Sequence, residues 1–223
     1  MSETRVVAID GPSGSGKSTV ARGVGDALGL RVLDTGAMYR AVTLAALEAG
    51  VDLADANLVA VIAGAARIEV EDDVHLDGRD VSAEIRTPTV TASVSTVSAH
   101  PGVRRELVAR QRHWVETHHG GVVEGRDIGT VVFPGAPVKV YLEASETERA
   151  RRRHLEEAAA DRNVAVEAVR DALARRDALD SGRAASPLRV ADDALVIDTT
   201  DRSVVEIVDE IVDRYRAATE VRP

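Results

Sequence analysis

The stretch IDGPSGSGKST, from Ile9 to Thr19, has the residue types and spacing of a loop that binds phosphate. Glycines let successive backbone N–H groups turn toward one anion, and a helix beginning beyond Gly16 would add the positive end of its dipole. Lys17 could then reach the β- and γ-phosphates of a nucleoside triphosphate, and the Ser18 hydroxyl could ligate Mg²⁺. The alternative is a chance glycine-rich turn, which the complete G-x-x-x-x-G-K-[ST] pattern disfavours. The predicted triphosphate-binding residues are Gly11, Pro12, Ser13, Gly14, Ser15, Gly16, Lys17, Ser18 and Thr19.

Two later segments carry guanidinium and carboxylate groups together. In EGRDIGTVVFP, Arg126 and Asp127 follow an apolar strand, which places them at the carboxyl edge of a sheet, where open α/β folds bind ligands. In RRDALDSGR, Arg176, Asp180 and Arg183 have the i, i+4, i+7 spacing of one helix face. The glycine before Arg183 indicates that the helix ends there, and the two arginines would form a fork for phosphoryl oxygens. For each segment alone, an ion pair on the surface stays an open alternative.

The segment DTGAMYR lies just past the second predicted strand. Asp34 could bind Mg²⁺ through water, so Ser18 and Asp34 form the predicted metal site. Thr35 and Arg40 lie where a second substrate would approach. The alternative is that Asp34 only caps the helix that follows.

Short apolar runs alternate with helical patterns along the chain. The predicted strands are 5–9, 31–34, 121–129, 138–145 and 194–200, and the predicted helices are 18–28, 36–50, 87–100, 101–118, 146–160, 164–180 and 201–218. The valines and threonines of 87–100 favour a strand, but Pro88 after Thr87 favours the start of a helix, which we assign. Strands that alternate with helices predict an α/β fold with a mainly parallel sheet covered on both faces.

One segment has a different pattern of apolar and polar residues. From Glu69 to Ser82 the residues alternate with period two around Asp77-Gly78, the dipeptide that favours a type I′ hairpin turn. We therefore expect a small antiparallel insertion in the parallel fold.

The composition limits the class of protein. With 223 residues, 44% of them hydrophobic, the chain can bury one substantial core, and without cysteine it can form neither disulfides nor thiolate metal sites. The stretch MSETRVVAID lacks the features of a secretory signal, and no apolar run is long enough to span a bilayer. We therefore expect a cytoplasmic protein with no membrane partner. The formal net charge of -9 argues against a nucleic-acid partner.

Several enzyme classes share a phosphate loop of this kind. Neither Lys17 nor Lys139 follows an asparagine, so the Asn-Lys-x-Asp guanine reader of switch proteins is missing. A motor or large ATPase would normally need a longer chain. A small kinase remains, and it must bind a second substrate opposite the triphosphate.

Together the motifs resemble the bacterial cytidylate kinase family. The matching segments are GPSGSGKST, DTGAMYRA, VSAEIRTPTV, HPGVRRELVARQR, EGRDIGTVVFP, PVKVYLEAS and RRDALDSGRAASPLRVADDALVIDTT, in order between Ile9 and Thr199. The phosphate loop is shared by many families, whereas EGRDIGTVVFP and RDxxDxxRxxxPLxxAxDA are far more specific. The resemblance implies ATP-dependent phosphorylation of CMP and dCMP, with Mg²⁺ as cofactor.

The resemblance also implies a fold and an organisation. A single P-loop nucleoside-monophosphate-kinase domain would span 1–223, with a five-stranded parallel sheet covered by helices on both faces. A small antiparallel acceptor-binding insert would occupy roughly 36–100, and a short lid roughly 149–163. We expect the protein to be a monomer.

Site residues follow from the same resemblance. The acceptor would be surrounded by Thr35, Tyr39, Arg40, Ser95, Arg104, Arg126, Asp127, Arg176, Asp180 and Arg183. Lys17, Arg126, Arg176 and Arg183 would be catalytic, and Arg152 would be the lid arginine on ATP, although Arg149, Arg151 and Arg153 could also serve. A carboxylate such as Asp127, with Ser95 and Arg104 near the edge, suits the exocyclic amine of cytosine. Asp180 would bind the ribose, and Arg40, Arg126 and Arg183 the phosphate.

Two alternative functions fit the same motifs less well. A kinase of the same fold could act on another small acceptor, such as UMP, AMP or shikimate, which a panel of acceptors would reveal. A regulatory module could sense ATP and transfer nothing, but it would not need a second set of arginines suited to phosphate.

Overall fold

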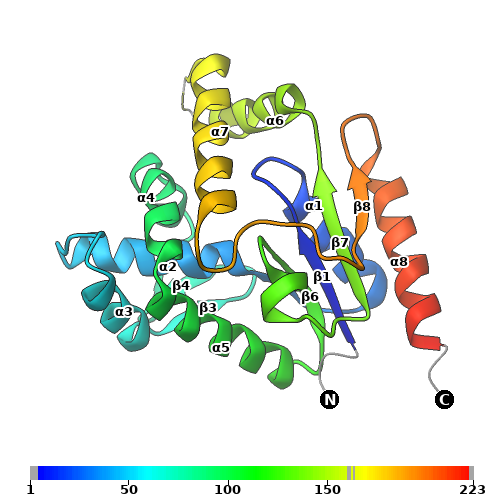
Figure 1. Cartoon of the computed structure of the whole chain (residues 1–223), viewed down its shortest axis with the longest axis horizontal. Helices are drawn as coiled ribbons and strands as arrows, with labels where there is room; N and C mark the ends of the chain where they lie inside the picture. Colours follow the sequence, from blue (N-terminus) through cyan, green and yellow to red (C-terminus); the bar gives the residue numbers. More distant parts are fainter. Residues whose placement is uncertain (1–4, 160–161, 163, 221–223) are drawn as a thin grey trace.

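The strand Val6–Asp10 (β1) is the central strand of the fold in this computed structural model, which describes residues 5–159, 162 and 164–220. It pairs with Gly121–Gly125 (β6) and Val138–Glu143 (β7), while Val32–Asp34 (β2) and Leu195–Asp198 (β8) form the two edges. All pairings are parallel and the order is β2-β6-β1-β7-β8. The predicted five-stranded parallel sheet is therefore confirmed (Figure 1).

Alternate residues of β1 face opposite sides of the sheet. Val6 and Ala8 belong to a core shared with helices Thr35–Glu48 (α2) and Pro101–Thr117 (α5). Val7 and Ile9 belong to a second core shared with Lys17–Leu28 (α1) and Val204–Glu220 (α8). Since helices cover both faces, every residue of β1 is buried, and the strand is the continuous apolar run typical of a parallel sheet.

The insert lies between β2 and β6 and occupies the left of Figure 1. It contains α2, helix Ala56–Ala65 (α3), a three-stranded antiparallel sheet, a short turn of 3₁₀ helix at Glu84–Arg86, and helix Pro88–Ala99 (α4). The strands of the small sheet are Ile68–Val70 (β3), Val74–Leu76 (β4) and Arg79–Asp80 (β5).

The predicted hairpin turn at Asp77-Gly78 is confirmed. Leu76 pairs with Arg79, so the two turn residues are the whole loop, and both have positive φ, 53° and 83°. Positive φ at both central residues is what a type I′ turn requires. The structure adds β3, which pairs with β4, so the hairpin is part of a three-stranded meander.

The ambiguous segment 87–100 is helical, as assigned. Pro88 occupies the first turn of α4, and Val90, Val94 and Val97 are buried at the i, i+4, i+7 spacing of one helix face. Helix α3 is an element that the sequence analysis missed. Its clearest signal is Asp55, whose carboxylate accepts the N–H groups of Asn57 and Leu58, both at 3.0 Å, as a helix N-cap does.

The predicted strand 121–129 is wrong beyond Gly125. After β6 the chain turns and forms a single π-helical turn, Ile128–Val132 (η3). The carboxylate of Asp10 accepts the N–H groups of Ile128 and Gly129, so these amides bond to a side chain of β1 and not to a neighbouring strand.

Helices Glu146–Ala159 (α6) and Val166–Gly182 (α7) follow β7 and pack against each other. α7 ends at Gly182, just before Arg183, as predicted. The predicted lid, roughly 149–163, coincides mostly with α6, and residues 160, 161 and 163 lie outside the described residues. Within the part of the chain that the structure describes, no helix is long and apolar enough to cross a membrane.

A pair of glycine substitutions tests the packing of α1 on the sheet. A Cβ at Gly25 would lie 2.7 Å from Val32 Cγ2 and 2.8 Å from Leu30 O, so Gly25→Ala should destabilise the protein by about 1–3 kcal/mol through overpacking. Gly64→Ala is the matched control, because a Cβ there meets nothing within 4 Å and helix propensity favours alanine by up to about 1 kcal/mol. Urea unfolding midpoints of the two variants measure the difference. Equal stability of both variants would contradict this packing.

Candidate active site

The phosphate loop connects the end of β1 to the start of α1. At Gly11, φ is 148°, and a Cβ would lie 2.1 Å from Leu142 O, so a side chain cannot be accommodated there. Gly16 is the N-cap of α1 with φ 87°, a left-handed conformation that glycine adopts without strain. The strand, loop and helix required for a phosphate site are therefore all present.

Lys17 lies inside the loop. Its Nζ donates a hydrogen bond of 2.6 Å to Pro12 O, and the side chain is buried. Burial, together with the nearby charges of Arg126 and Arg176, lowers the pKa of Lys17 to about 7. Burial and the charge of Asp34 raise the pKa of the neighbouring Glu124 to about 7.

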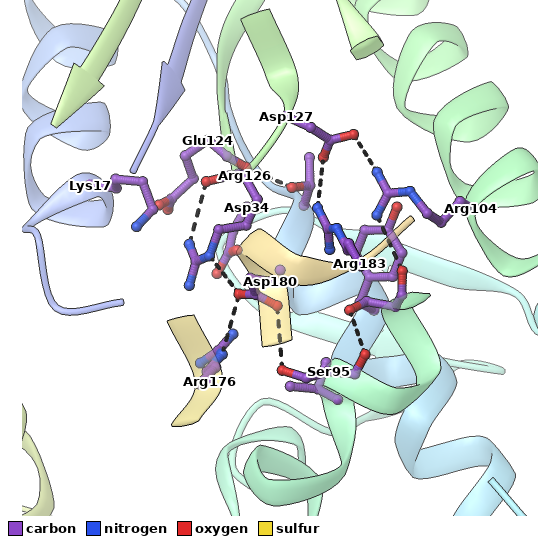
Figure 2. A pocket seen from close by; sticks show the side chains of 16 residues that line it. Lys17, Asp34, Ser95, Arg104, Glu124, Arg126, Asp127, Arg176, Asp180 and Arg183 are labelled. Atoms are coloured by element: carbon purple, nitrogen blue, oxygen red, sulfur yellow. Dashed lines mark hydrogen bonds and ion pairs between the residues drawn. The ribbon is translucent and has the colours of Figure 1, made fainter. Parts of the chain in front are cut away.

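A cavity opens beside Lys17, at the carboxyl ends of β1, β2 and β6 (Figure 2). It is lined by Lys17, Asp34, Thr35, Gly36, Tyr39, Val94, Ser95, Ser98, Arg104, Glu124, Gly125, Arg126, Asp127, Arg176, Asp180 and Arg183. All the predicted acceptor residues except Arg40 are among them. The structure thus brings together residues from the insert, from the loop after β6 and from the end of α7.

Asp127 lies at one side of this cavity between two guanidinium groups. Arg104 forms a buried ion pair with it, and Arg183 Nη2 lies 3.7 Å from its Oδ1. Arg104 also stacks over the ring of Tyr39, 5.4 Å from the ring centroid. The flanking arginines fix the carboxylate in the cavity wall, where it can accept hydrogen bonds from a ligand.

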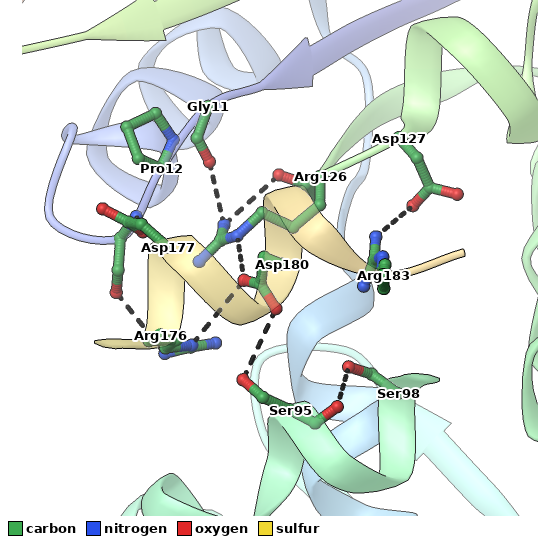
Figure 3. Close-up of polar contacts among 12 residues, drawn as sticks. Gly11, Pro12, Ser95, Ser98, Arg126, Asp127, Arg176, Asp177, Asp180 and Arg183 are labelled. Atoms are coloured by element: carbon green, nitrogen blue, oxygen red, sulfur yellow. Dashed lines mark hydrogen bonds and ion pairs between the residues drawn. The ribbon is translucent and has the colours of Figure 1, made fainter. Parts of the chain in front are cut away.

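Asp180 connects the acceptor side to the phosphate loop (Figure 3). Its Oδ2 accepts a hydrogen bond of 3.0 Å from Arg126 Nε, and Arg126 Nη1 donates to Gly11 O, also at 3.0 Å. Its Oδ1 lies 3.4 Å from Ser95 Oγ. Burial raises the pKa of Asp180, but the charges of Arg126, Arg176 and Arg183 outweigh this and lower it.

Arg176 lies one helical turn before Asp180, as predicted, and its Nε is 4.0 Å from Asp180 Oδ2. Its Nη1 also lies 3.4 Å from Ser13 Oγ in the phosphate loop. Burial, with the charges of Arg126 and Arg40, lowers the pKa of Arg176 to about 9. The Arg176 guanidinium therefore lies between Ser13 of the phosphate loop and Asp180.

Arg40 is placed differently from the other predicted acceptor residues. Its Nη1 donates to Ile85 O at 3.1 Å and to Thr91 Oγ1 at 2.8 Å, so it bonds within the insert and does not line the cavity. Burial, then the charge of Arg153, lowers the pKa of Arg40 to about 10. The sequence could not show that Ile85 and Thr91 fold back onto this side chain.

The lid arginines of α6 point to different places. Arg149 pairs with Asp177 and donates to Ser13 O at 3.1 Å, which ties α6 and α7 to the phosphate loop. Arg152 donates to Thr199 Oγ1 at 2.9 Å, and Thr199 in turn donates to Ser15 O. Arg153 lies beside the opening between α4 and α7.

Arg152 lines a second hollow, on the outer side of the phosphate loop. Its lining includes Ser15, Gly16, Thr19, Arg152, Thr199, Thr200, Asp201 and Arg202. The predicted triphosphate residues Thr19 and Arg152 therefore lie together, next to the segment that joins β8 to α8. The two hollows share no lining residue.

Of the two predicted metal residues, Asp34 lines the cavity beside Lys17 and Ser18 does not. Asp34 Oδ1 caps α2 through Ala37 N at 3.1 Å, so the capping alternative is realised, and its Oδ2 lies 3.9 Å from Arg86 Nη2. The Ser18 hydroxyl lies close enough to Glu124 to lower the pKa of that carboxyl. One hydroxyl and two adjacent carboxylates are oxygen donors of the kind that Mg²⁺ prefers, and bound phosphates usually complete its coordination. The described residues contain no cluster of three or more His, Cys, Asp or Glu suited to a metal.

Sequence reasoning missed three carboxylates of the site. Glu124 is buried against Lys17, Asp10 holds the loop after β6, and Asp177 accepts Ser13 N–H at 3.2 Å. The three residues lie in IDGPSGSGKST (Asp10), EGRDIGTVVFP (Glu124) and RRDALDSGR (Asp177). Acidic residues flanking a phosphate loop would have been the signal.

Comparison with known proteins agrees with this geometry. The family model for cytidylate kinase matches residues 7–217. A cytidylate kinase of Mycobacterium avium (strain 104) is 52% identical over 226 residues, covering 99% of both chains. A cytidylate kinase of Corynebacterium glutamicum is 47% identical over 220 residues, covering 96% of both chains. A gluconokinase structure from Sinorhizobium meliloti 1021 covers 97% of this chain and 94% of its own with a TM-score of 0.51; at 15% identity it shows the shared fold alone.

The lowered pKa of Lys17 predicts proton uptake when a nucleoside triphosphate binds. With a pKa of about 7, Lys17 is mostly neutral in the empty protein at about pH 8.5, and the phosphates should return its pKa toward the ordinary value. Calorimetry of ATP binding in two buffers of different ionisation enthalpy should therefore show uptake approaching one proton. At about pH 6 Lys17 is already protonated, so this uptake should vanish. Absence of uptake at the higher pH would contradict the burial effect.

Proposed function

The chain belongs to the cytidylate kinase family, and we propose that it transfers the γ-phosphoryl group of ATP to CMP and dCMP in the cavity beside Lys17. The single observation that carries this assignment is the placement of Arg126. One guanidinium bonds both to Gly11 O of the phosphate loop and to Asp180 of the acceptor cavity, at 3.0 Å each. A group in that position can contact a donor and an acceptor phosphate at once.

Recognition of the acceptor base is assigned to Asp127 and its neighbours. The exocyclic amine of cytosine can donate a hydrogen bond to the Asp127 carboxylate. The neighbouring ring acceptors of cytosine can accept hydrogen bonds from Arg104 and Ser95. Uracil would present a carbonyl oxygen to the same carboxylate and be repelled. Asp180 would bind the ribose, which requires it to exchange its contact with Ser95 for the sugar hydroxyl.

Transfer would proceed by in-line attack of a CMP phosphate oxygen on the γ-phosphorus of ATP. That oxygen is already ionised, so no general base is needed. The attacking and leaving groups must be aligned, and their charge neutralised, because positioning and electrostatics supply most of the acceleration in phosphoryl transfer. Lys17, Arg126, Arg176 and Arg183 all line the cavity, and their charges would do this.

Mg²⁺ is the cofactor implied by the family. When bound, it neutralises phosphate charge, and Ser18, Asp34 and Glu124 are the oxygen donors of this chain that would hold it, directly or through water. The ATP base and sugar would occupy the hollow beside Arg152 and Thr199, because that hollow adjoins the phosphate loop on the side away from the acceptor.

The insert at roughly 36–100 and the lid at roughly 149–163 would close over the two substrates. Support comes from a contact between the insert and the helix that follows the lid, Ser95 of α4 with Asp180 of α7. A monomer in the cytoplasm, the remaining expectation from the sequence, stays a prediction.

A substrate panel tests the assignment. A coupled ADP-release assay over CMP, dCMP, UMP, AMP and shikimate should show turnover mainly with the two cytidine nucleotides. Asp127→Ala should weaken the binding of CMP more than the binding of ATP. It should also narrow the CMP to UMP ratio of kcat/KM by roughly tenfold or more, which is the discrimination that one bidentate base contact provides. An unchanged ratio would remove Asp127 from base recognition. Turnover with AMP or shikimate alone would favour the alternative acceptors.

Arg183→Ala tests the role of the arginines. Arg183 is buried beside Asp127, and loss of an arginine that stabilises a transferring phosphoryl group lowers kcat by roughly 10³–10⁵. Arg183→Lys should restore little, because a lysine lacks the planar fork. Arg170→Ala, at an exposed position of α7, is the matched control and should leave kcat unchanged. Equal effects of the two alanine variants would contradict the assignment.

A further inference from the structure

Asp10 is a buried carboxylate at the end of β1 and is not among the residues that line either hollow. Only 4% of its surface is exposed. Its Oδ1 accepts the N–H of Ile128 and its Oδ2 accepts the N–H of Gly129, both at 2.8 Å. Each oxygen therefore bonds one of two consecutive amides at the start of η3, immediately after Asp127.

This arrangement replaces the usual way of beginning a helical turn. An aspartate at an N-cap position normally accepts the first free N–H groups of its own helix. Asp127 occupies the N-cap position of η3 but makes no such bond, and its carboxylate contacts Arg104 and Arg183 in the acceptor cavity. Asp10 satisfies the amides from a neighbouring strand, which leaves Asp127 available to the cavity.

The same contact links the two substrate sites. Asp10 directly precedes Gly11, the first residue of the phosphate loop, and Ile128 directly follows Asp127. A carboxylate that bonds both amides with its two oxygens fixes the loop after β6 in both distance and orientation. The base-contacting carboxylate is thereby positioned relative to the phosphate loop.

We propose that Asp10 is a positioning residue for acceptor selection: by capping Ile128 and Gly129 from β1, it keeps the Asp127 carboxylate turned toward the base of the acceptor nucleotide. The proposal rests on the proposed function, because it concerns how that site distinguishes cytosine from uracil. Asp10 itself touches no substrate, and it acts through Asp127.

The surroundings of Asp10 also predict that acceptor selection depends on pH. Burial raises the pKa of Asp10 to about 6, the amides of Gly129 and Ile128 oppose this, and the charge of Asp127 adds to it. Lys17 of α1 faces it with a positive charge, and Tyr141 of β7 lies near enough to feel its negative charge. Below about pH 6 the protonated carboxyl has a hydroxyl on one oxygen, so it no longer offers two strong acceptors to the two amides.

Asp10→Asn tests the proposal. The amide side chain keeps one acceptor but presents an N–H₂ group to the other backbone N–H, so the cap is lost at nearly unchanged volume. We expect the CMP to UMP ratio of kcat/KM to narrow by roughly tenfold, with KM for ATP unchanged. Asp55→Asn is the control, because Asp55 also accepts two consecutive backbone N–H groups, at the start of its own helix α3, and is not among the residues that line either hollow. It should leave the ratio unchanged.

A double-mutant cycle shows whether Asp10 acts through Asp127. In an Asp127→Ala background, Asp10→Asn should not narrow the ratio further, since the group it positions is gone. A further loss in that background, or an equal loss of CMP and ATP efficiency in the single variant, would overturn the proposal and make Asp10 a general structural residue.

The wild-type protein provides a test that needs no Asp10 variant to fold. Between about pH 8 and about pH 5.5, the CMP to UMP ratio should fall as Asp10 is protonated, and the titration of the substrate phosphates cancels in the ratio. Asp127→Ala should show a flat profile. If the wild-type protein prefers CMP but its CMP to UMP ratio does not change with pH, the proposal for Asp10 is overturned and the proposed function stands. Turnover of neither nucleotide would overturn the proposed function as well.

Discussion

A concentration of positive charge in one cavity is the constraint on which this site depends, in a chain whose formal net charge is -9. The cavity contains the guanidinium groups of Arg104, Arg126, Arg176 and Arg183. Two like charges about 4 Å apart repel by roughly 4 kcal/mol at an effective dielectric constant of about 20. Asp127 and Asp180 oppose this repulsion, because each lies close to more than one guanidinium. The two carboxylates thus keep the cavity assembled before an anionic substrate enters.

The same arrangement keeps a buried carboxylate ionised. Asp180 keeps a lowered pKa despite its burial, since the surrounding arginines outweigh the cost of desolvation. It therefore remains an ionised acceptor for a hydroxyl group. Lys17 shows the opposite balance, because it is buried among arginines and its pKa falls to about 7. A bound polyphosphate supplies the negative charge that this lysine lacks. The surroundings of Lys17 are thus short of negative charge, which a bound anion would supply.

The fold brings these groups together through parallel strands. β1 and β6 are neighbours in register, so Asp10 lies opposite Gly125, and the phosphate loop and the Arg126-Asp127 segment leave the sheet side by side. Helix α7 then returns over the same edge and brings Asp180 within hydrogen-bond distance of Arg126 (Figure 3). The insert adds Ser95 from α4, and α5, which follows the insert, adds Arg104. Residues more than a hundred positions apart in the chain become neighbours because strand order differs from sequence order.

The sequence by itself determined the parallel sheet, the phosphate loop and the turn at Asp77-Gly78, and its motifs contain most of the residues that line the cavity beside Lys17. These depend on local patterns: the period of apolar residues, the glycines of a tight loop, the spacing of arginines on a helix and the motifs of one family. It predicted a strand where η3 forms, assigned no role to Asp10 or Glu124, and could not show that Arg40 bonds to Ile85 and Thr91. Only the tertiary structure decided these points. The partner of a buried polar group is chosen by which distant segment folds against it, and no local spacing records that choice.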